Sequence, residues 1–105
     1  MNELLITEIQ IIPTKPQNGL VAFASCVINS QIYVGSIAIY TAPSTESGYR
    51  LVWPAKTLGR GMRVPIAHPI NRDAGYSIQK QIVTQYQKLM ENLGDEINDP
   101  KQNIA

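Results

Sequence analysis

Residues Trp53 to Ile70 read WPAKTLGRGMRVPIAHPI, a stretch that holds the only tryptophan and the only histidine of the 105-residue chain. Its glycines predict a loop over residues 55–62. Because Pro65 cannot donate a hydrogen bond to a sheet, residues 63–67 are predicted to form a short edge segment. His68 lies just before a predicted helix, where an imidazole more often hydrogen-bonds the connecting backbone than acts in catalysis. The end of this stretch therefore closes the predicted sheet and leads into the helix.

Upstream of this stretch, runs rich in β-branched residues predict strands. The first covers residues 3–12 and is predicted to end at Pro13. Residues 20–28 and 32–40 are separated by three turn-forming residues, which predicts a hairpin, and residues 49–53 form a further short strand. Residues 20–28 are apolar on both faces. We therefore expect both faces to be covered, one by the helix and the other by a curled part of the sheet or a second subunit.

Downstream of residue 71 the apolar residues recur with the period of a helix. Asn71 or Asp73 can cap its start, and Gly94 is well placed to end it. Strands followed by one long helix predict an α+β domain, a twisted antiparallel sheet of four to five strands with the helix packed on it. We expect one domain over residues 1–93 and a polar, frayed tail over residues 94–105. The predicted core stripe of the helix consists of Ile78, Ile82, Val83, Tyr86, Leu89, Met90 and Leu93.

The composition restricts the class of protein. No run approaches the roughly 20 apolar residues of a membrane-spanning helix, and MNELLITEIQ at the start carries acidic residues where a signal peptide carries basic ones. We therefore expect a cytoplasmic protein without a membrane partner. Cys26 is the only cysteine, which excludes an intramolecular disulfide and leaves no Cys/His cluster with zinc-site spacing. Its apolar neighbours indicate a small buried side chain.

The sequence offers little for catalysis. His68 is the only imidazole, and no nucleophile lies in a strand-to-helix elbow. Gly59-Arg60-Gly61 lacks the third glycine of a dinucleotide fingerprint, and no phosphate-binding loop motif is present. The acidic residues gather near the C-terminal end, where they form no paired-carboxylate site. We therefore expect no catalytic residue, no metal site and no cofactor, and a protein that is not an enzyme.

The charges are segregated, although the net charge is only +1. From Lys15 to Lys88 there are eight basic residues and two acidic ones, Glu46 and Asp73, so this span carries 8 − 2 = +6. From Arg50 to Arg72 there are five cations and no acid. Such a span can meet successive phosphates of a nucleic acid, but ordinary solubilising surface charge remains an equal alternative on charge alone.

The candidate binding residues follow from this distribution. Trp53 and Tyr49 are possible stacking platforms, although a tryptophan that ends a strand is more often part of the core. The candidate phosphate contacts are Lys56, Arg60 and Arg63, with Arg50, Arg72 and Lys80 at the margin.

The segment from Pro54 to Asn71 resembles the stage V sporulation protein G (SpoVG, septation regulator) family. The matching residues are Pro54, Lys56, Gly61 and the run IAHPIN at residues 66–71, and the spacing fits without a gap. The resemblance extends over roughly residues 20–93. It implies a small bacterial cytoplasmic regulator that binds DNA and RNA, folds as a twisted antiparallel sheet with a C-terminal helix, and forms a homodimer through sheet edges.

The chain departs from the family pattern at positions where the family has basic residues. Thr57, Gly75 and Ser77 carry no charge here. Arg60, Arg63 and Lys80 would then supply the charge from other positions. The alternative is a divergent dimeric protein–protein interaction module that does not bind nucleic acid directly.

Overall fold

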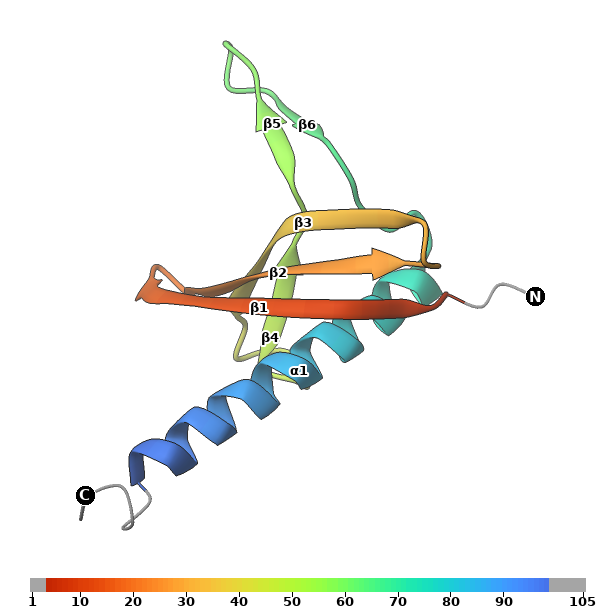
Figure 1. The fold of residues 1–105 in the computed structure, drawn as a ribbon. Coiled ribbons are helices and arrows are strands. Elements are labelled where there is room, and N and C mark those ends of the chain that lie inside the picture. Colours follow the sequence, from red (N-terminus) through yellow and green to blue (C-terminus); the bar gives the residue numbers. More distant parts are fainter. Residues whose placement is uncertain (1–3, 99–105) are drawn as a thin grey trace.

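The computed structural model describes residues 4–98, with side chains up to residue 93. Figure 1 shows a four-stranded antiparallel sheet, one long helix laid along it and a small hairpin that projects away from both. The predicted α+β fold, with strands first and a long helix last, is therefore confirmed. The sheet has the order β1-β2-β3-β4, with β1 at Ile6–Gln17, β2 at Leu20–Ile28, β3 at Ile32–Thr41 and β4 at Tyr49–Val52. The remaining elements are β5 at Ala55–Thr57, β6 at Arg63–Pro65 and α1 at Arg72–Asn98.

Tight turns connect the first three strands. Asn18 and Gly19 join β1 to β2 and have positive φ angles of 53° and 92°, the conformation for which an Asn-Gly pair is favoured in hairpins. Residues 29–31 join β2 to β3, as the sequence predicts. The side-chain oxygen of Asn29 accepts a hydrogen bond of 2.8 Å from the backbone N–H of Leu5, which fixes this turn against the start of the chain.

The core lies between the sheet and α1. In β2 the helix-facing residues are small, which lets the helix approach the sheet closely, while β3 and α1 contribute larger aliphatic side chains. Tyr86 of α1 meets Tyr49 of β4 edge-to-face, with ring centroids 5.2 Å apart. The buried core cluster consists of Ile6, Ala22, Ala24, Cys26, Ile37, Ile39, Ile78, Ile82 and Tyr86.

The opposite face of the sheet has a different environment. The strand registers place Ile12, Phe23, Ala38 and Val52 in one row across it, and Ile12 is 65% exposed. Within the described part of the chain, α1 is the single helix and it covers the other face. Residues 20–28 were expected to be covered on both faces. Within the single chain, α1 covers one of these faces.

Several expected boundaries are wrong. β1 begins at Ile6, β4 ends at Val52 and β6 ends at Pro65, one to three residues inside the expected ranges. β1 does not end at Pro13 but continues to Gln17, because an outer strand tolerates a residue without an N–H group and the register is irregular after Pro13. Residues 55–62 are not entirely loop, since Ala55–Thr57 pair with β6. α1 continues past Gly94 to Asn98, so the preceding helical turns outweigh the glycine as a stop signal.

The helix prediction is otherwise confirmed in its core. Ile78, Ile82, Val83 and Tyr86 are buried, whereas Met90 is exposed. Among residues 4–98, no helix has the length and apolarity needed to span a membrane. The remaining predicted tail, residues 99–105, lies outside the described residues.

The projecting hairpin extends the molecule. The radius of gyration is 16.0 Å, compared with about 13 Å for a compact domain of 100 residues. Figure 1 shows β5 and β6 leading away from the sheet, and the C-terminal half of α1 extending beyond it. The packing of β5 and β6 is chiefly with each other. An isolated two-stranded hairpin is marginally stable in water, so this segment is a good candidate for a contact surface.

Candidate functional site

The β5–β6 hairpin is a short ribbon with a well-defined register. Ala55 pairs with Pro65, Lys56 with Val64 and Thr57 with Arg63. At the tip, the N–H of Leu58 donates to the carbonyl of Met62 at 2.8 Å, and the N–H of Gly61 donates to the carbonyl of Leu58 at 2.9 Å. Gly61 has a φ of 77°, which a residue with a side chain adopts only under strain. The loop that the sequence indicated is thus a closed and ordered turn.

The hairpin brings three of the six candidate cations together. Because side chains alternate along a strand, Lys56 projects from one face of the ribbon and Arg63 from the other. Arg60 lies in the turn at the tip, and all three side chains are exposed. The ribbon therefore presents positive charge on both faces and at its end.

The other three candidates lie on different elements. Arg50 is on β4, on the sheet face away from the helix, with its guanidinium carbon 5.1 Å from the ring centroid of Tyr40. Arg72 is the first residue of α1, where the chain returns from the hairpin. Lys80 lies two turns further along α1. The sequence-adjacent cations are therefore grouped, whereas Lys80 belongs to a separate surface.

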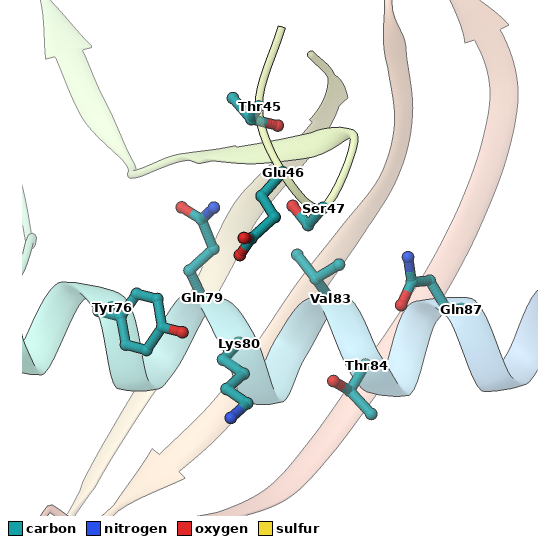
Figure 2. A pocket seen from close by; sticks show the side chains of 9 residues that line it. All are labelled: Thr45, Glu46, Ser47, Tyr76, Gln79, Lys80, Val83, Thr84 and Gln87. Carbon is teal, nitrogen blue, oxygen red and sulfur yellow. The ribbon is translucent and has the colours of Figure 1, made fainter. Parts of the chain in front are cut away.

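A hollow beside Lys80 is a second candidate feature. Figure 2 shows the loop with Thr45, Glu46 and Ser47 above α1, with Lys80 extending away from that loop. The hollow encloses about 230 Å³ and is lined by polar side chains from the loop and the helix. Its lining also includes Val83 and the ring of Tyr76, and this mixture of apolar groups, one carboxylate, one ammonium group and neutral amides and hydroxyls favours no particular ligand class. We assign this hollow no function.

Aromatic and prolyl side chains line an open cavity at the base of the hairpin. The backbone N–H groups of Ile66 and Ala67 both donate to the carbonyl of Pro54, at 3.0 Å and 3.5 Å, and tie the returning strand to the departing one. Trp53 is half-buried and packs against the core, as expected for a tryptophan that ends a strand. It also lines this cavity of about 350 Å³ together with His68. Sequence reasoning missed the cavity because its walls come from both sides of the hairpin.

His68 and Asn71 shape the connection between hairpin and helix. His68 is exposed, and its Nδ1 lies 2.9 Å from the carbonyl oxygen of Pro69, so the predicted hydrogen bond to the connecting backbone is confirmed. The side-chain oxygen of Asn71 accepts a bond of 2.8 Å from the N–H of Ala74. Asn71, rather than Asp73, is therefore the N-cap of α1.

Exposed apolar side chains share the hairpin with the cations. Met62 at the tip is 62% exposed and Ile66 near the base is 65% exposed. Leu58 and Val64 are also exposed. The alternating pattern at residues 62–66 is the signal that could have indicated this surface from the sequence, since Arg63 and Pro65 separate Met62, Val64 and Ile66.

Two titratable side chains of the core, Cys26 and Tyr86, have shifted pKa values, and neither shift favours the reactive, ionised form. Burial raises the pKa of the Cys26 thiol above its ordinary value, which disfavours the reactive thiolate. Burial, with a smaller contribution from Tyr49, raises the pKa of Tyr86. In the part of the chain that the structure describes, no three His, Cys, Asp or Glu residues are grouped to hold a metal ion. The prediction of Cys26 as a buried apolar side chain is confirmed.

These features define a small α+β protein in which a helix-backed sheet carries a projecting, positively charged hairpin. Residues 4–88 match the SpoVG family, and the chain therefore belongs to the SpoVG family. The resemblance drawn from residues 54–71 is thus confirmed, and the match covers the four-stranded sheet, the hairpin and α1 as far as Lys88.

Curated relatives support this assignment. "Putative septation protein SpoVG" of Caldanaerobacter subterraneus subsp. tengcongensis is 26% identical over 87 residues, which cover 83% of this chain and 92% of the relative. A protein of the same name from Onion yellows phytoplasma is 30% identical over 87 residues, covering 83% of this chain and 85% of the relative. The relative from Aster yellows witches'-broom phytoplasma is 29% identical over the same length. These proteins are named for septation, and none of the three is named as an enzyme.

Proposed function

We propose that this protein is a bacterial cytoplasmic regulator that binds DNA and/or RNA through the β5–β6 hairpin. The observation that carries the proposal is the grouping of Lys56, Arg60 and Arg63 on one exposed, projecting ribbon. The ribbon lies within a span, from Arg50 to Arg72, that contains no acidic residue. A phosphate backbone approaching the hairpin would therefore meet cations without local repulsion.

The shape of the hairpin suits a nucleic acid. A two-stranded ribbon can enter the major groove of duplex DNA, which is about 12 Å wide. Lys56 and Arg63, on opposite faces of the ribbon, would then each face phosphates along one side of the groove. Arg60, at the tip, would enter the groove first. On a single strand the same cations would follow one phosphate backbone. Such contacts give affinity without sequence preference.

The marginal cations extend this surface to different degrees. Arg72 is close to the hairpin along the chain, and Arg50 is on the open face of the sheet. They would contact a nucleic acid that continues past the base of the hairpin. Lys80 would contribute only where the nucleic acid continues along α1.

We also propose that the protein acts as a homodimer paired through sheet edges. β1 and β4 are the outer strands of the four-stranded sheet and each has one neighbouring strand in the monomer. Exposed edges readily pair with another chain. Edge pairing extends a sheet without covering its faces, so burial of the apolar row that contains Ile12 and Phe23 would require the partner to pack over the uncovered face as well. Sedimentation equilibrium at micromolar concentration tests this, and a strictly monomeric mass would contradict it.

The exposed apolar side chains favour a second candidate function. Met62 and Ile66 lie on the same hairpin as the cations, and such side chains are typical of protein–protein contacts. A dimeric interaction module would use the hairpin for a protein partner instead of a nucleic acid. This candidate predicts no nucleic-acid binding and a co-purifying protein.

Fluorescence anisotropy with mixed-sequence DNA and RNA at low salt tests the main proposal. We expect binding of the parent protein and its loss in the variant with Lys56→Glu and Arg63→Glu, because both changes reverse exposed charges on the hairpin. The melting temperature should be nearly unchanged, since neither side chain is in the core.

A matched control separates the hairpin from net charge. Lys15→Glu with Lys88→Glu changes the net charge by the same amount on exposed sites away from the hairpin. We expect this control to keep most of the binding. The proposal fails if the parent shows no binding at about 100 μM, the weak end expected of non-specific complexes, or if the two double variants lose binding equally.

A further inference from the structure

We infer that the cavity at the base of the hairpin holds one unpaired nucleobase, so that the protein prefers single-stranded RNA or DNA to a duplex. This inference rests on the proposed nucleic-acid function and adds a base-binding site to it. The walls of the cavity include Trp53, His68, two prolines and the side chain of Arg63.

The cavity is formed by the fold of the hairpin. The register pairs Ala55 with Pro65 and Thr57 with Arg63, so Ala55, Pro65 and Arg63 share one ribbon face. That face lines the open side of the cavity together with Trp53, while the two hydrogen bonds to the Pro54 carbonyl hold the strands together at its base. Proline rings at two positions of the wall limit backbone movement. The site is therefore largely formed before a ligand arrives.

The size and lining of the cavity suit a flat aromatic ring. Its volume of about 350 Å³ lies at the low end of the range of roughly 300–1,000 Å³ for small-molecule sites. An indole and an imidazole supply flat surfaces, and unpaired bases stack on such side chains in single-strand recognition. A purely aliphatic ligand would leave the imidazole and guanidinium without partners. A small inorganic anion would leave the indole ring without a stacking partner.

Charge favours a nucleotide over a peptide side chain. Arg63 belongs both to the cavity wall and to the group of hairpin cations. A base in the cavity would therefore place its own phosphate near Arg63 and the neighbouring phosphates along the ribbon towards Arg60. Aromatic, proline-lined sites also take peptide segments, but only a nucleic acid offers a regular series of anions to the five cations that lie, without an acid, between Arg50 and Arg72.

His68 adds a polar group with a defined role. A carbonyl oxygen can only accept a hydrogen bond, so Nδ1 of His68 carries the proton that it shares with the Pro69 carbonyl at 2.9 Å. In the neutral ring, Nε2 is then an acceptor. It can accept from an amino or ring N–H group at the edge of a base. A base within a duplex already uses those groups for pairing, and must leave the stack to enter the cavity.

The single tryptophan provides a direct test. We would titrate the parent protein with a single-stranded oligonucleotide, with its duplex form, and with an abasic strand that keeps the phosphates and lacks the bases. Stacking of a base on Trp53 should quench its fluorescence with the single strand and not with the abasic strand. The abasic strand should bind roughly 5- to 150-fold more weakly, the range that loss of one stacked base produces.

Two variants on opposite faces of the ribbon sharpen the test. Ala55→Leu adds three carbon atoms on the face that lines the cavity, whereas Val64→Leu adds one carbon atom on the other face and reports whether a larger hairpin side chain alone affects binding. Ala55→Leu should remove the advantage of the single strand over the abasic strand, and Val64→Leu should keep it. Binding of the abasic strand should be the same in both variants, which also reports that the hairpin remains folded.

The outcomes separate this inference from the proposed function. Equal binding of single, duplex and abasic strands without quenching would overturn the base site and leave phosphate binding by the hairpin intact. A shift of Ala55→Leu from dimer to monomer, with no change in the quenching, would assign the cavity to a second copy of the chain and also overturn it. Failure of all three nucleic acids to bind would refute both proposals.

Discussion

At the scale of single residues, one side chain decides where the helix begins. The side-chain oxygen of Asn71 satisfies the N–H of Ala74 at 2.8 Å, one of the first N–H groups of α1 that have no partner within the helix. The same residue follows the proline-containing turn that leads out of the hairpin. Its loss would therefore loosen the junction between the candidate site and the core.

Asn71→Ala should destabilise the protein by about 1 kcal/mol, the usual cost of losing an N-cap. For a domain of this size, that corresponds to a decrease of roughly 4–8 °C in melting temperature. Thermal unfolding followed by circular dichroism measures it. Asn71→Asp keeps the accepting oxygen and adds a charge that the helix N-terminus favours, so it should melt close to the parent. Equal melting of the alanine variant and the parent would show that the bond contributes nothing.

Tyr86 predicts how stability depends on alkaline pH. Burial, and to a smaller extent Tyr49, raises the pKa of Tyr86 in the folded protein. Above about pH 10 the unfolded chain ionises while the folded chain keeps its proton, so the folded state binds more protons and the unfolding free energy falls as pH rises. Below that pH the contribution is constant.

Tyr86→Phe should therefore reduce the loss of stability between pH 9 and 11. The ring, which is 5% exposed and packs against Tyr49, is retained, so the fold should persist. Urea unfolding at pH 7, 9 and 11 gives the comparison. Cys26 contributes a further decline from about pH 9 in both proteins, because burial raises its pKa as well. If the two proteins lose stability in parallel from pH 9 to pH 11, Tyr86 is not the group responsible.

At the scale of elements, the conformation of the hairpin depends on its tip. Gly61 has a φ of 77°, and a Cβ added there would contact nothing within 4 Å. Gly59 also has free space around it, and its backbone lies outside the left-handed region. A substitution at Gly61 therefore introduces backbone strain alone, and the same substitution at Gly59 is the matched control.

Gly61→Ala should open the tip without unfolding the domain. A strain of about 1 kcal/mol would increase the opening equilibrium roughly fivefold. Hydrogen exchange of the Leu58 N–H, which is bonded to the Met62 carbonyl, should accelerate by that factor, while amides of β2 and β3 keep their rates. Gly59→Ala should leave the Leu58 amide unchanged. Equal acceleration in both variants would mean that φ at Gly61 is not what holds the tip.

The elements differ in how far the sequence predicts them. The β2–β3 hairpin and the helix cap were predictable because turn residues at positions 29–31 and at Asn71 act on their immediate neighbours. The extension of β1 through Pro13 was not, since it depends on β1 being an outer strand. Gly94 indicated a helix end that the structure places at Asn98. Local signals therefore predict where elements begin more reliably than how they pair.

The candidate site shows the same limit. The common location of Lys56, Arg60 and Arg63 on one hairpin could be expected because they belong to one short segment. The cavity beside them was not predictable, because its walls meet only when Ala55 pairs with Pro65 across the ribbon. The position of Lys80 on a different surface also depends on how α1 packs. The charge of a segment follows from its sequence alone, whereas a cavity between two strands forms only once their pairing register is fixed.

At the scale of the whole molecule, the distribution of charge matters more than its total. A net charge of +1 gives little long-range attraction for a polyanion. Binding would therefore depend on the few cations that the hairpin presents, and its dependence on salt should be correspondingly moderate. The slope of affinity against salt concentration also reports how many hairpins of a dimer contact one nucleic acid.

Under the proposed function, one engaged hairpin would place three cations, Lys56, Arg60 and Arg63, on phosphates. The slope of log affinity against log salt should then be about −2.7 on duplex DNA and about −2.1 on a single strand, and two engaged hairpins would double both values. Anisotropy titrations between 50 and 200 mM salt measure the slope, and sedimentation of the complex gives its stoichiometry.

Arg60→Gln tests the assignment because it removes one cation at the tip and keeps a shorter, neutral polar side chain there. The duplex slope should become shallower by about 0.9 if one hairpin is engaged and by about 1.8 if both are. Lys88→Gln removes the same charge from an exposed position on α1 and should leave the slope unchanged. If Arg60→Gln leaves the slope unchanged while Lys88→Gln reduces it, the nucleic acid lies along the helix and the hairpin is not the binding surface.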